Sequence, residues 1–345
     1  MANLNNRLLN KKNSSISILV PRKKKKAFDP LKVMSLKYLV QNKHFKEPKW
    51  FVKPFITEGL TILAGKPKIG KSLFALYMGI TIAQGFRFMK KFNCTQSAVY
   101  YLSYEDPARR IQNRTIKMIG KNFVPKNFLL PIYAEGFPKM NNGGFNCIKK
   151  IIEEKENVGV IIIDTLGRFV DKRFSGNLNF QEDYDLLSKL QVFANKKHIA
   201  IILLHHTTKK TSEDPFDEIQ GTIGYTASCD NLIVMRRNNG MIDVHTRGRD
   251  FEDQIISVEM DKSTLKWGLK GNARESGLSI EAKQILSLLK KDPHKFFGVK
   301  EIRKFTEDSS QNTENKIKRL MVKDLIIKNS RNMYQLNLDM YEKLK

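Results

Sequence analysis

The residues with the clearest chemical potential form a glycine-containing stretch near position 70. Gly65 is followed, after four residues, by Gly70, Lys71 and Ser72, which is the GxxxxGK[ST] pattern. Because the stretch joins an apolar run to a helical pattern, its backbone N–H groups and a helix N-terminus should converge on a bound phosphate. Lys71 is expected to reach the β- and γ-phosphates of ATP, and Ser72 to bind Mg²⁺. The expected nucleotide-binding residues are Gly65, Lys66, Pro67, Lys68, Ile69, Gly70, Lys71, Ser72 and Leu73.

Acidic residues at the ends of two other apolar runs could serve the same site. Asp164 follows four aliphatic residues in VIIID. An aspartate there is costly to bury unless a cation lies opposite, so Asp164 is expected to order Mg²⁺. Glu105 and Asp106 end the run AVYYLSYED, where the sheet edge would bring them near the γ-phosphate. Glu105 is the predicted general base, whereas Asp106 suits the cap of a helix that begins at Pro107.

Two histidines, His205 and His206, end the run IAIILLHHT. A single histidine there would most simply be a satisfied surface side chain. A tandem pair at the same sheet edge favours a sensor that donates to the γ-phosphate and reports its loss to the following loop.

These residues need a scaffold that brings strand ends together. The chain alternates apolar runs with amphipathic stretches, which predicts an α/β fold with a mainly parallel sheet. Segments 240–250 and 254–269 are expected to be antiparallel edge strands. The expected parallel strands are 60–65, 98–106, 127–133, 158–166, 199–207 and 230–237.

The C-terminal part has a different pattern. Helices are expected at 278–291, opened by Ser279, at 298–308 and from 310, the last running into a strand that pairs with 332–337. Three helices and a hairpin predict a winged helix. Its third helix could enter a major groove or present a protein-binding face, and DNA is slightly favoured. Its basic residues are Lys316, Lys318, Arg319 and Lys323. The expected domains are a disordered basic arm (1–28), an ATPase domain (29–269), a linker (270–277) and the winged helix (278–345).

The charge of the chain points to a polyanionic partner. With 61 Lys and Arg against 35 Asp and Glu, the net charge is +26, and nucleic acid is the leading candidate because binding releases its counterions. No apolar run is long enough for a membrane span, so we expect a soluble, cytoplasmic protein with no membrane partner. Cys94, Cys147 and Cys229 are widely separated, which predicts neither a disulfide framework nor a zinc site.

The order of the motifs adds a family resemblance. Six motifs within residues 50–269 resemble the RecA-type ATPase core. In chain order they are the phosphate loop, EDP, IIIDTLGRF, LLHHTTK, GTIGYTASCDNLIVMRR and RGRD before a final Trp. More narrowly, they resemble the RepA-type replicative helicases of plasmids and related phage proteins, which form hexameric rings. The resemblance implies nucleotide and magnesium contacts for Lys71 and Ser72, metal ordering for Asp164, catalysis for Glu105 and γ-phosphate sensing for His206.

Rings of this kind place ATP sites between subunits and complete each with a basic residue of the neighbour. The resemblance assigns this role to Arg247 or Arg249 in TRGRD. RepA-type helicases tend to carry an arginine before the glycine of GTIG, whereas this chain has Gln220, so the choice of trans-acting residue stays open.

Nucleic-acid contacts in RecA-like rings come from the loops after the metal-binding and sensor strands, here 167–183 and 207–224. Both loops are long and partly basic, and would track single-stranded DNA without reading its sequence. The alternative is a pair of plain surface connections, which is less common at these lengths. The candidate DNA-binding residues are Arg168, Lys172, Arg173, Lys209 and Lys210.

Together these features predict a homo-oligomeric, ring-forming ATPase that translocates on single-stranded DNA and unwinds duplex. It would act in the replication of a plasmid, phage or mobile element, with a replication initiator or primase as a candidate partner. Two alternatives remain open at this point: a RecA-like recombination or repair ATPase, and a nucleotide-gated DNA-binding regulator.

Overall fold

The computed structural model describes residues 33–41, 47–131, 136–155, 157–170, 180–238, 240–272, 278, 280–306 and 310–339. The chain divides into two units, Met1–Glu47 and Pro48–Lys345. The described part of the first unit contains α1 (Leu36–Gln41), a short helix with no buried residue. The predicted basic arm, Ser279, Lys172 and Arg173 lie outside the described residues.

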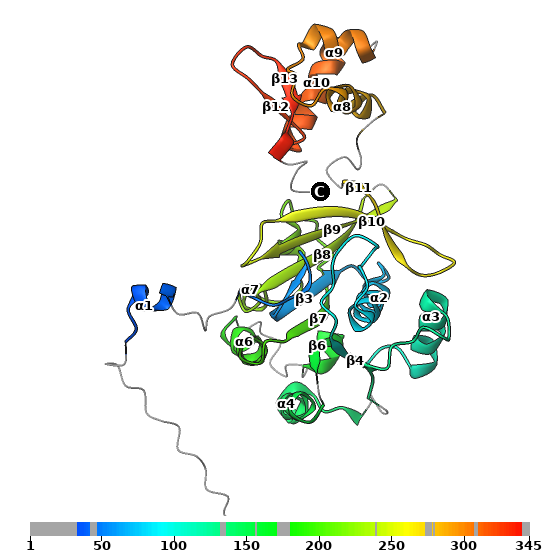
Figure 1. The fold of residues 1–345 in the computed structure, drawn as a ribbon, viewed down its shortest axis with the longest axis vertical. Helices are drawn as coiled ribbons and strands as arrows, with labels where there is room; N and C mark the ends of the chain where they lie inside the picture. The colour runs from blue at the N-terminus through cyan, green and yellow to red at the C-terminus, as the bar shows by residue number, and fades with distance from the viewer. Residues whose placement is uncertain are drawn as a thin grey trace, which may run out of the picture. The chain divides into compact units, whose positions relative to one another are not determined.

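The described residues of the second unit form a nine-stranded sheet in the order β11-β10-β9-β8-β3-β7-β6-β4-β5 (Figure 1). Six adjacent strands, β8, β3, β7, β6, β4 and β5, run parallel to one another. Beyond β8 the sheet continues with β9, β10 and β11, which pair in antiparallel fashion. The predicted mixed α/β fold with a mainly parallel sheet is therefore confirmed. The strands are β3 (Gly59–Gly65), β4 (Ala98–Ser103), β5 (Phe128–Leu129), β6 (Val158–Asp164), β7 (Ala200–His206), β8 (Asn231–Asn238), β9 (Met241–Gly248), β10 (Gln254–Met260) and β11 (Trp267–Asn272).

Helices cover both faces of this sheet, which explains why its central strands are aliphatic on both sides. Every residue of β3 and β6 is buried. One hydrophobic cluster packs α2 and α3 on one face, and a second packs α4, α5, α6 and α7 on the other. The helices are α2 (Lys71–Gln84), α3 (Ala108–Ile119), α4 (Gly144–Glu154), α5 (Leu166–Phe169), α6 (Phe180–Lys197) and α7 (Ile223–Ala227), with 3₁₀ turns η2 (Met140–Asn142) and η3 (Pro215–Glu218).

The strand register brings the predicted site residues to one edge of the sheet. Gly65, at the end of β3, is level with His206 of β7. Asp164, at the end of β6, is level with Ser103 of β4. Because these strands are parallel neighbours, the loops that follow them emerge together.

Two local expectations were wrong in detail. Among the described residues of the run 127–133, only Phe128 and Leu129 form a strand (β5), and Pro131 beyond them has no N–H to continue a ladder. The run 254–269 forms two strands, because Asp261 accepts hydrogen bonds from the backbone N–H groups of Ser263 and Thr264 and makes a turn. Residues Trp50–Val52 form β1, which pairs with β2 (Ile56–Thr57) in a separate two-stranded ribbon.

The C-terminal segment has its own hydrophobic cluster. Its elements occur in the predicted order of three helices followed by a hairpin. None of the helices among the described residues is long and apolar enough to cross a membrane. The C-terminal elements are α8 (Ile280–Lys291), α9 (Val299–Thr306), α10 (Ser310–Val322), β12 (Ile326–Lys328) and β13 (Tyr334–Leu336).

Candidate nucleotide-binding site

The predicted phosphate loop connects the central strand β3 directly to α2. Gly70, the residue before α2, has a φ of 106°, in the left-handed region that glycine tolerates. A Cβ on Gly70 would lie 2.8 Å from the Trp267 ring. A larger residue at this position would be unfavourable for two reasons, because of its strained backbone conformation and because its Cβ would clash with Trp267. The loop keeps its backbone close to the start of α2, which is the arrangement that a phosphate cradle requires.

Lys71 is the first residue of α2, and its side chain is almost fully buried. Its Nζ donates to the backbone carbonyls of Gly65 (2.8 Å) and Lys66 (3.1 Å) and lies 3.4 Å from Nδ1 of His206. Burial lowers the pKa of Lys71, and the charges of Asp164 and Glu105 partly offset that shift. The ammonium is thus held at the loop by acceptors that a ligand could replace.

Asp164 is fully buried at the end of β6. Its Oδ2 accepts a hydrogen bond of 2.9 Å from the Tyr101 hydroxyl, while its buried Oδ1 has no protein partner. Burial raises the pKa of Asp164 to about 6, and the neighbouring hydroxyls of Ser72 and Tyr101 lower it in part. One carboxylate oxygen is therefore fixed and the other is available, next to the Ser72 hydroxyl.

These residues fit the nucleotide and metal that the loop implies. An orphaned carboxylate oxygen, a neighbouring hydroxyl and a buried ammonium are a hard-oxygen and cationic set suited to Mg²⁺ and phosphate. Ser72 and Asp164 would hold the metal, and Lys71 would contact the phosphates. Without a ligand, the buried carboxylate of Asp164 keeps one oxygen that has no hydrogen-bond partner.

Replacing Asp164 by asparagine should stabilise the ligand-free protein at about pH 8 by on the order of 2–3 kcal/mol, because its pKa is raised by roughly two units. The folded protein holds this proton more tightly than the unfolded chain does. The Asp164 contribution to stability is thus fully present below the unfolded pKa and is lost as the pH rises through the folded one. The advantage of Asp164→Asn should shrink as the pH falls below about 6 and vanish near 4. Thermal unfolding of both proteins across this range measures it, and an advantage that is the same at every pH would contradict the prediction.

Glu105 and Asp106 lie side by side after β4 but have different partners. Glu105 is exposed, and its Oε1 accepts a 3.2 Å hydrogen bond from Oγ1 of Thr165, the residue after Asp164. Asp106 forms ion pairs with Arg110 (2.8 Å) and Arg114 of α3. The expected capping role of Asp106 is wrong, because Pro107 occupies the cap position without a side-chain hydrogen bond. Asp106 instead fastens α3 to the strand end, which leaves Glu105 as the available carboxylate.

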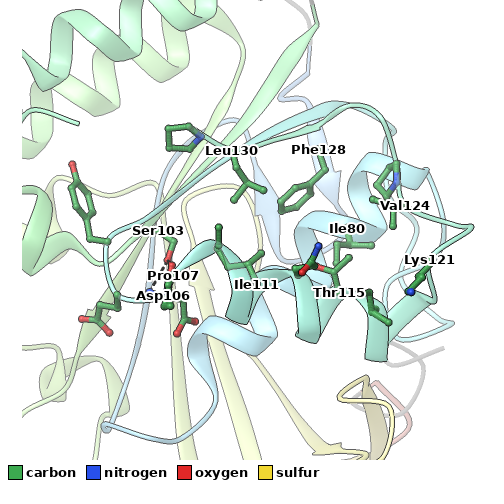
Figure 2. Close-up of a pocket in the computed structure, with 17 residues that line it drawn as sticks. Ile80, Ser103, Asp106, Pro107, Ile111, Thr115, Lys121, Val124, Phe128 and Leu130 are labelled. Carbon is green, nitrogen blue, oxygen red and sulfur yellow. Dashed lines mark hydrogen bonds between the residues drawn. The ribbon is translucent and has the colours of Figure 1, made fainter. Parts of the chain in front are cut away.

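A groove of about 800 Å³ begins at these two carboxylates. In Figure 2, Ile111 of α3 lies along one wall and Phe128 and Leu130 along the other. Asp106 lies at one end of the groove and Lys121 at the other. No pattern in the sequence indicated this groove.

The two histidines have separate environments. His205 is buried, and its Nε2 donates to the carbonyl of Gln220 at 2.7 Å. Burial lowers the pKa of His205 to about 4, so it is neutral at physiological pH. His206 points to Lys71 instead, and burial followed by the Lys71 charge lowers its pKa. His205 therefore has a structural role, through its hydrogen bond to Gln220. His206 is the histidine that lies beside the phosphate loop.

The two arginines proposed to act in trans differ in how firmly they are held. Arg247 forms ion pairs with Asp214 (2.8 Å) and Asp253 (2.7 Å), and its guanidinium lies 4.2 Å from the centroid of Phe216. Arg249 has a weaker contact, 3.5 Å to Asp230, and its side chain is 56% exposed. Arg249 is the more available cation.

Arg249 lies at the opposite end of β3 from the phosphate loop. Its partner Asp230 is bound through its backbone N–H to the carbonyl of Leu60, near the start of that strand. From Leu60 to Gly65 the strand advances by about 16 Å at 3.3 Å per residue. The side chain of Arg249 is too short to span this distance and reach the Lys71 of its own chain.

The described candidates for DNA contacts lie in the loops that leave the same sheet edge as the phosphate loop. Arg168 belongs to α5, directly after β6, and Lys209 and Lys210 follow β7. All three side chains are exposed. β6 and β7 are parallel neighbours, so these loops begin side by side.

Sequence reasoning missed Tyr101 and Thr165, which contact Asp164 and Glu105. The signal for Tyr101 was its place two residues before Ser103 in β4. Alternate residues of a strand share a face, and Ser103 is level with Asp164, so Tyr101 had to lie on the Asp164 side. Thr165 carried no comparable signal beyond its position next to Asp164.

Comparison with known proteins gives a matching family and distant structural likenesses that include a helicase and a recombinase. Residues 27–212, just over half of the chain, match an AAA domain. A DnaB-like replicative helicase, studied with its interactions with primase, aligns with a TM-score of 0.47 at 12% identity, over 61% of this chain and 57% of the helicase. The RadB recombinase aligns with a TM-score of 0.43 at 13% identity, over 61% of this chain and 90% of the recombinase. No curated protein matches the chain.

The AAA match includes the phosphate loop, Glu105, Asp164 and His206, and it ends before the Arg247–Arg249 segment. The chain spans little more than half the length of the helicase that it resembles.

Proposed function

Because the chain belongs to the AAA domain family of P-loop ATPases, we propose that it is an ATP-driven DNA helicase or translocase of the RepA type. It acts in the replication of a plasmid, phage or mobile element, as a ring with ATP sites between subunits. The observation that carries the proposal is the separation of Arg249 from its own phosphate loop by the length of β3. In this proposal Asp164 orders the metal, Glu105 is the base and His206 is the sensor. The exposed cation Arg249 lies at the opposite end of β3.

In this proposal the chain's residues divide the work of hydrolysis. Bound Mg·ATP supplies the phosphoryl group and the metal's charge. Lys71 and the loop N–H groups bind phosphate oxygens, and Ser72 and Asp164 hold the metal. Glu105, oriented by Thr165, accepts a proton from water. His206 lies beside Lys71 and is placed to respond to the γ-phosphate.

The DNA substrate is supported by charge. The net charge of +26 favours a polyanion, and Arg168, Lys209 and Lys210 project from loops beside the site. Such loops couple the ATP site to a strand through phosphate contacts. Lys172 and Arg173 complete the predicted set in residues beyond those described.

The C-terminal elements α8 to β13 are proposed to be a winged helix, a separate domain after the predicted linker, whose first residues (270–272) belong to β11 instead. Lys318 and Arg319 are exposed on α10, the helix that would enter a major groove. This domain would hold duplex DNA while the ATPase domain moves along one strand.

Strand displacement on forked DNA tests the proposed function. Purified protein should separate forks with ATP but not with an analogue that resists hydrolysis, and it should prefer forks with one tail polarity. DNA should stimulate its ATPase activity, and electron microscopy should show rings. DNA-independent ATPase activity without unwinding would overturn the helicase assignment. Strand exchange by open filaments would instead identify a recombination ATPase.

A further inference from the structure

The groove beside the candidate site is mostly aliphatic. Ile111 and Ile116 of α3 form one wall, and Val124, Phe128 and Leu130 contribute to the other. Val124 is 50% exposed and Leu130 is 44% exposed. A surface hollow of about 800 Å³ with apolar walls has the size and character of a binding site.

Both walls carry positive charge. The stretch 107–131 contains six basic residues and no acidic residue. Arg110 and Arg114 are used by Asp106. Among the described residues Lys117, Lys121 and Lys126 are exposed and form no ion pair. The groove thus has mainly apolar walls, with Glu105 and Asp106 at its inner end and the basic Lys121 at its outer end.

We propose that this groove docks a short acidic, amphipathic segment of a partner protein. Apolar side chains of the segment fill the space between Ile111 and Leu130, and its carboxylates meet Lys121 and Lys126. This is helix-in-groove recognition, in which buried apolar anchors give affinity and rim charges give selectivity.

Two other occupants fit less well. Single-stranded DNA is bound by stacking on successive aromatic faces, whereas the described lining of the groove has two aromatic residues, Tyr104 and Phe128, among mainly aliphatic residues and prolines. The chain's own first 50 residues carry 13 basic and 2 acidic residues, so like charge opposes their entry.

Docking would also affect the candidate ATP site, because the inner end of the groove includes Glu105 and Ser103. A segment that fills the groove contacts the strand end that carries the proposed base. This regulatory consequence rests on the proposed function, whereas binding itself does not.

Fluorescence anisotropy with a designed peptide tests the proposal. The probe is a labelled helical peptide with leucines at i, i+3, i+4 and i+7 and glutamates elsewhere. Its controls replace every glutamate by lysine, or every leucine by serine. The full-length Lys121→Glu/Lys126→Glu and Val124→Asp variants should each bind the acidic probe at least 10-fold more weakly than the wild type. The matched charge reversal Lys196→Glu/Lys197→Glu, in α6 on the other face of the sheet, should bind it like the wild type.

The outcomes separate binding from hydrolysis, because the assay needs no ATP. Equal affinity for the serine control would overturn the apolar part of the proposal, and equal affinity of the Lys121→Glu/Lys126→Glu variant would overturn the basic rim. If the same variant instead loses affinity for an oligothymidylate or changes the oligomeric state, the occupant is DNA or a second copy and the proposal is wrong. Absence of ATPase activity with groove binding intact would refute the proposed function alone.

Discussion

Glu105→Gln should lower ATP turnover by about 10²- to 10⁴-fold, the usual contribution of a general base, while leaving ATP binding intact. Glutamine has the same size and can still accept the hydrogen bond from Thr165. It cannot take a proton from water. The variant should therefore bind nucleotide without hydrolysing it. Steady-state phosphate release and equilibrium binding of a fluorescent ATP analogue measure the two effects separately.

Asp106→Asn is the matched control, one residue away. The Asp106 carboxylate is shared between Arg110 and Arg114, so its loss should loosen α3 and lower the melting temperature with little change in turnover. Should Asp106→Asn abolish turnover while Glu105→Gln does not, the two carboxylates have exchanged roles and the assignment of Glu105 is wrong.

The sequence was sufficient to locate the residues at the sheet edge, for a geometrical reason. In a parallel sheet, strand ends meet on one side. An apolar run that stops at Asp164, His206 or Glu105 therefore predicts proximity to the loop at Gly65 without knowledge of any side-chain contact. The register between β3 and β7 and between β4 and β6 follows this expectation.

What the sequence could not supply is which side chains pair with one another in the folded protein. Asp106 resembled a helix cap because the residue before Pro107 is often one, yet the arginines at positions 110 and 114 compete for its carboxylate more effectively. The groove could not be predicted for a similar reason. Its walls are a helix and an irregular segment, and the hydrophobic pattern of the sequence does not determine the distance between them. The tandem histidines show a third case, in which neighbours on one strand face opposite sides.

Arg249→Ala should lower the ATPase activity of the assembled protein by about 10³-fold, as expected for loss of a trans-acting arginine. The side chain is exposed and loosely held by Asp230, so the fold and nucleotide binding should be retained. A mixing experiment reveals the trans action. In a ring of Arg249→Ala and Glu105→Gln subunits, an interface between an intact Glu105 and an intact Arg249 is complete.

Two inactive variants should therefore restore activity when mixed before assembly. At equal amounts and random order, about a quarter of the interfaces are complete, because each head-to-tail contact takes one surface from each neighbour. Arg247→Ala is the control. Its ion pairs with Asp214 and Asp253 and its contact with Phe216 mark it as a structural residue, so it should lower the melting temperature and leave hydrolysis per folded subunit largely unchanged. Mixtures that stay inactive, or an Arg249→Ala protein that hydrolyses ATP at the wild-type rate, would exclude Arg249 as the completing residue, and restored activity with Arg247→Ala in its place would transfer the role to Arg247.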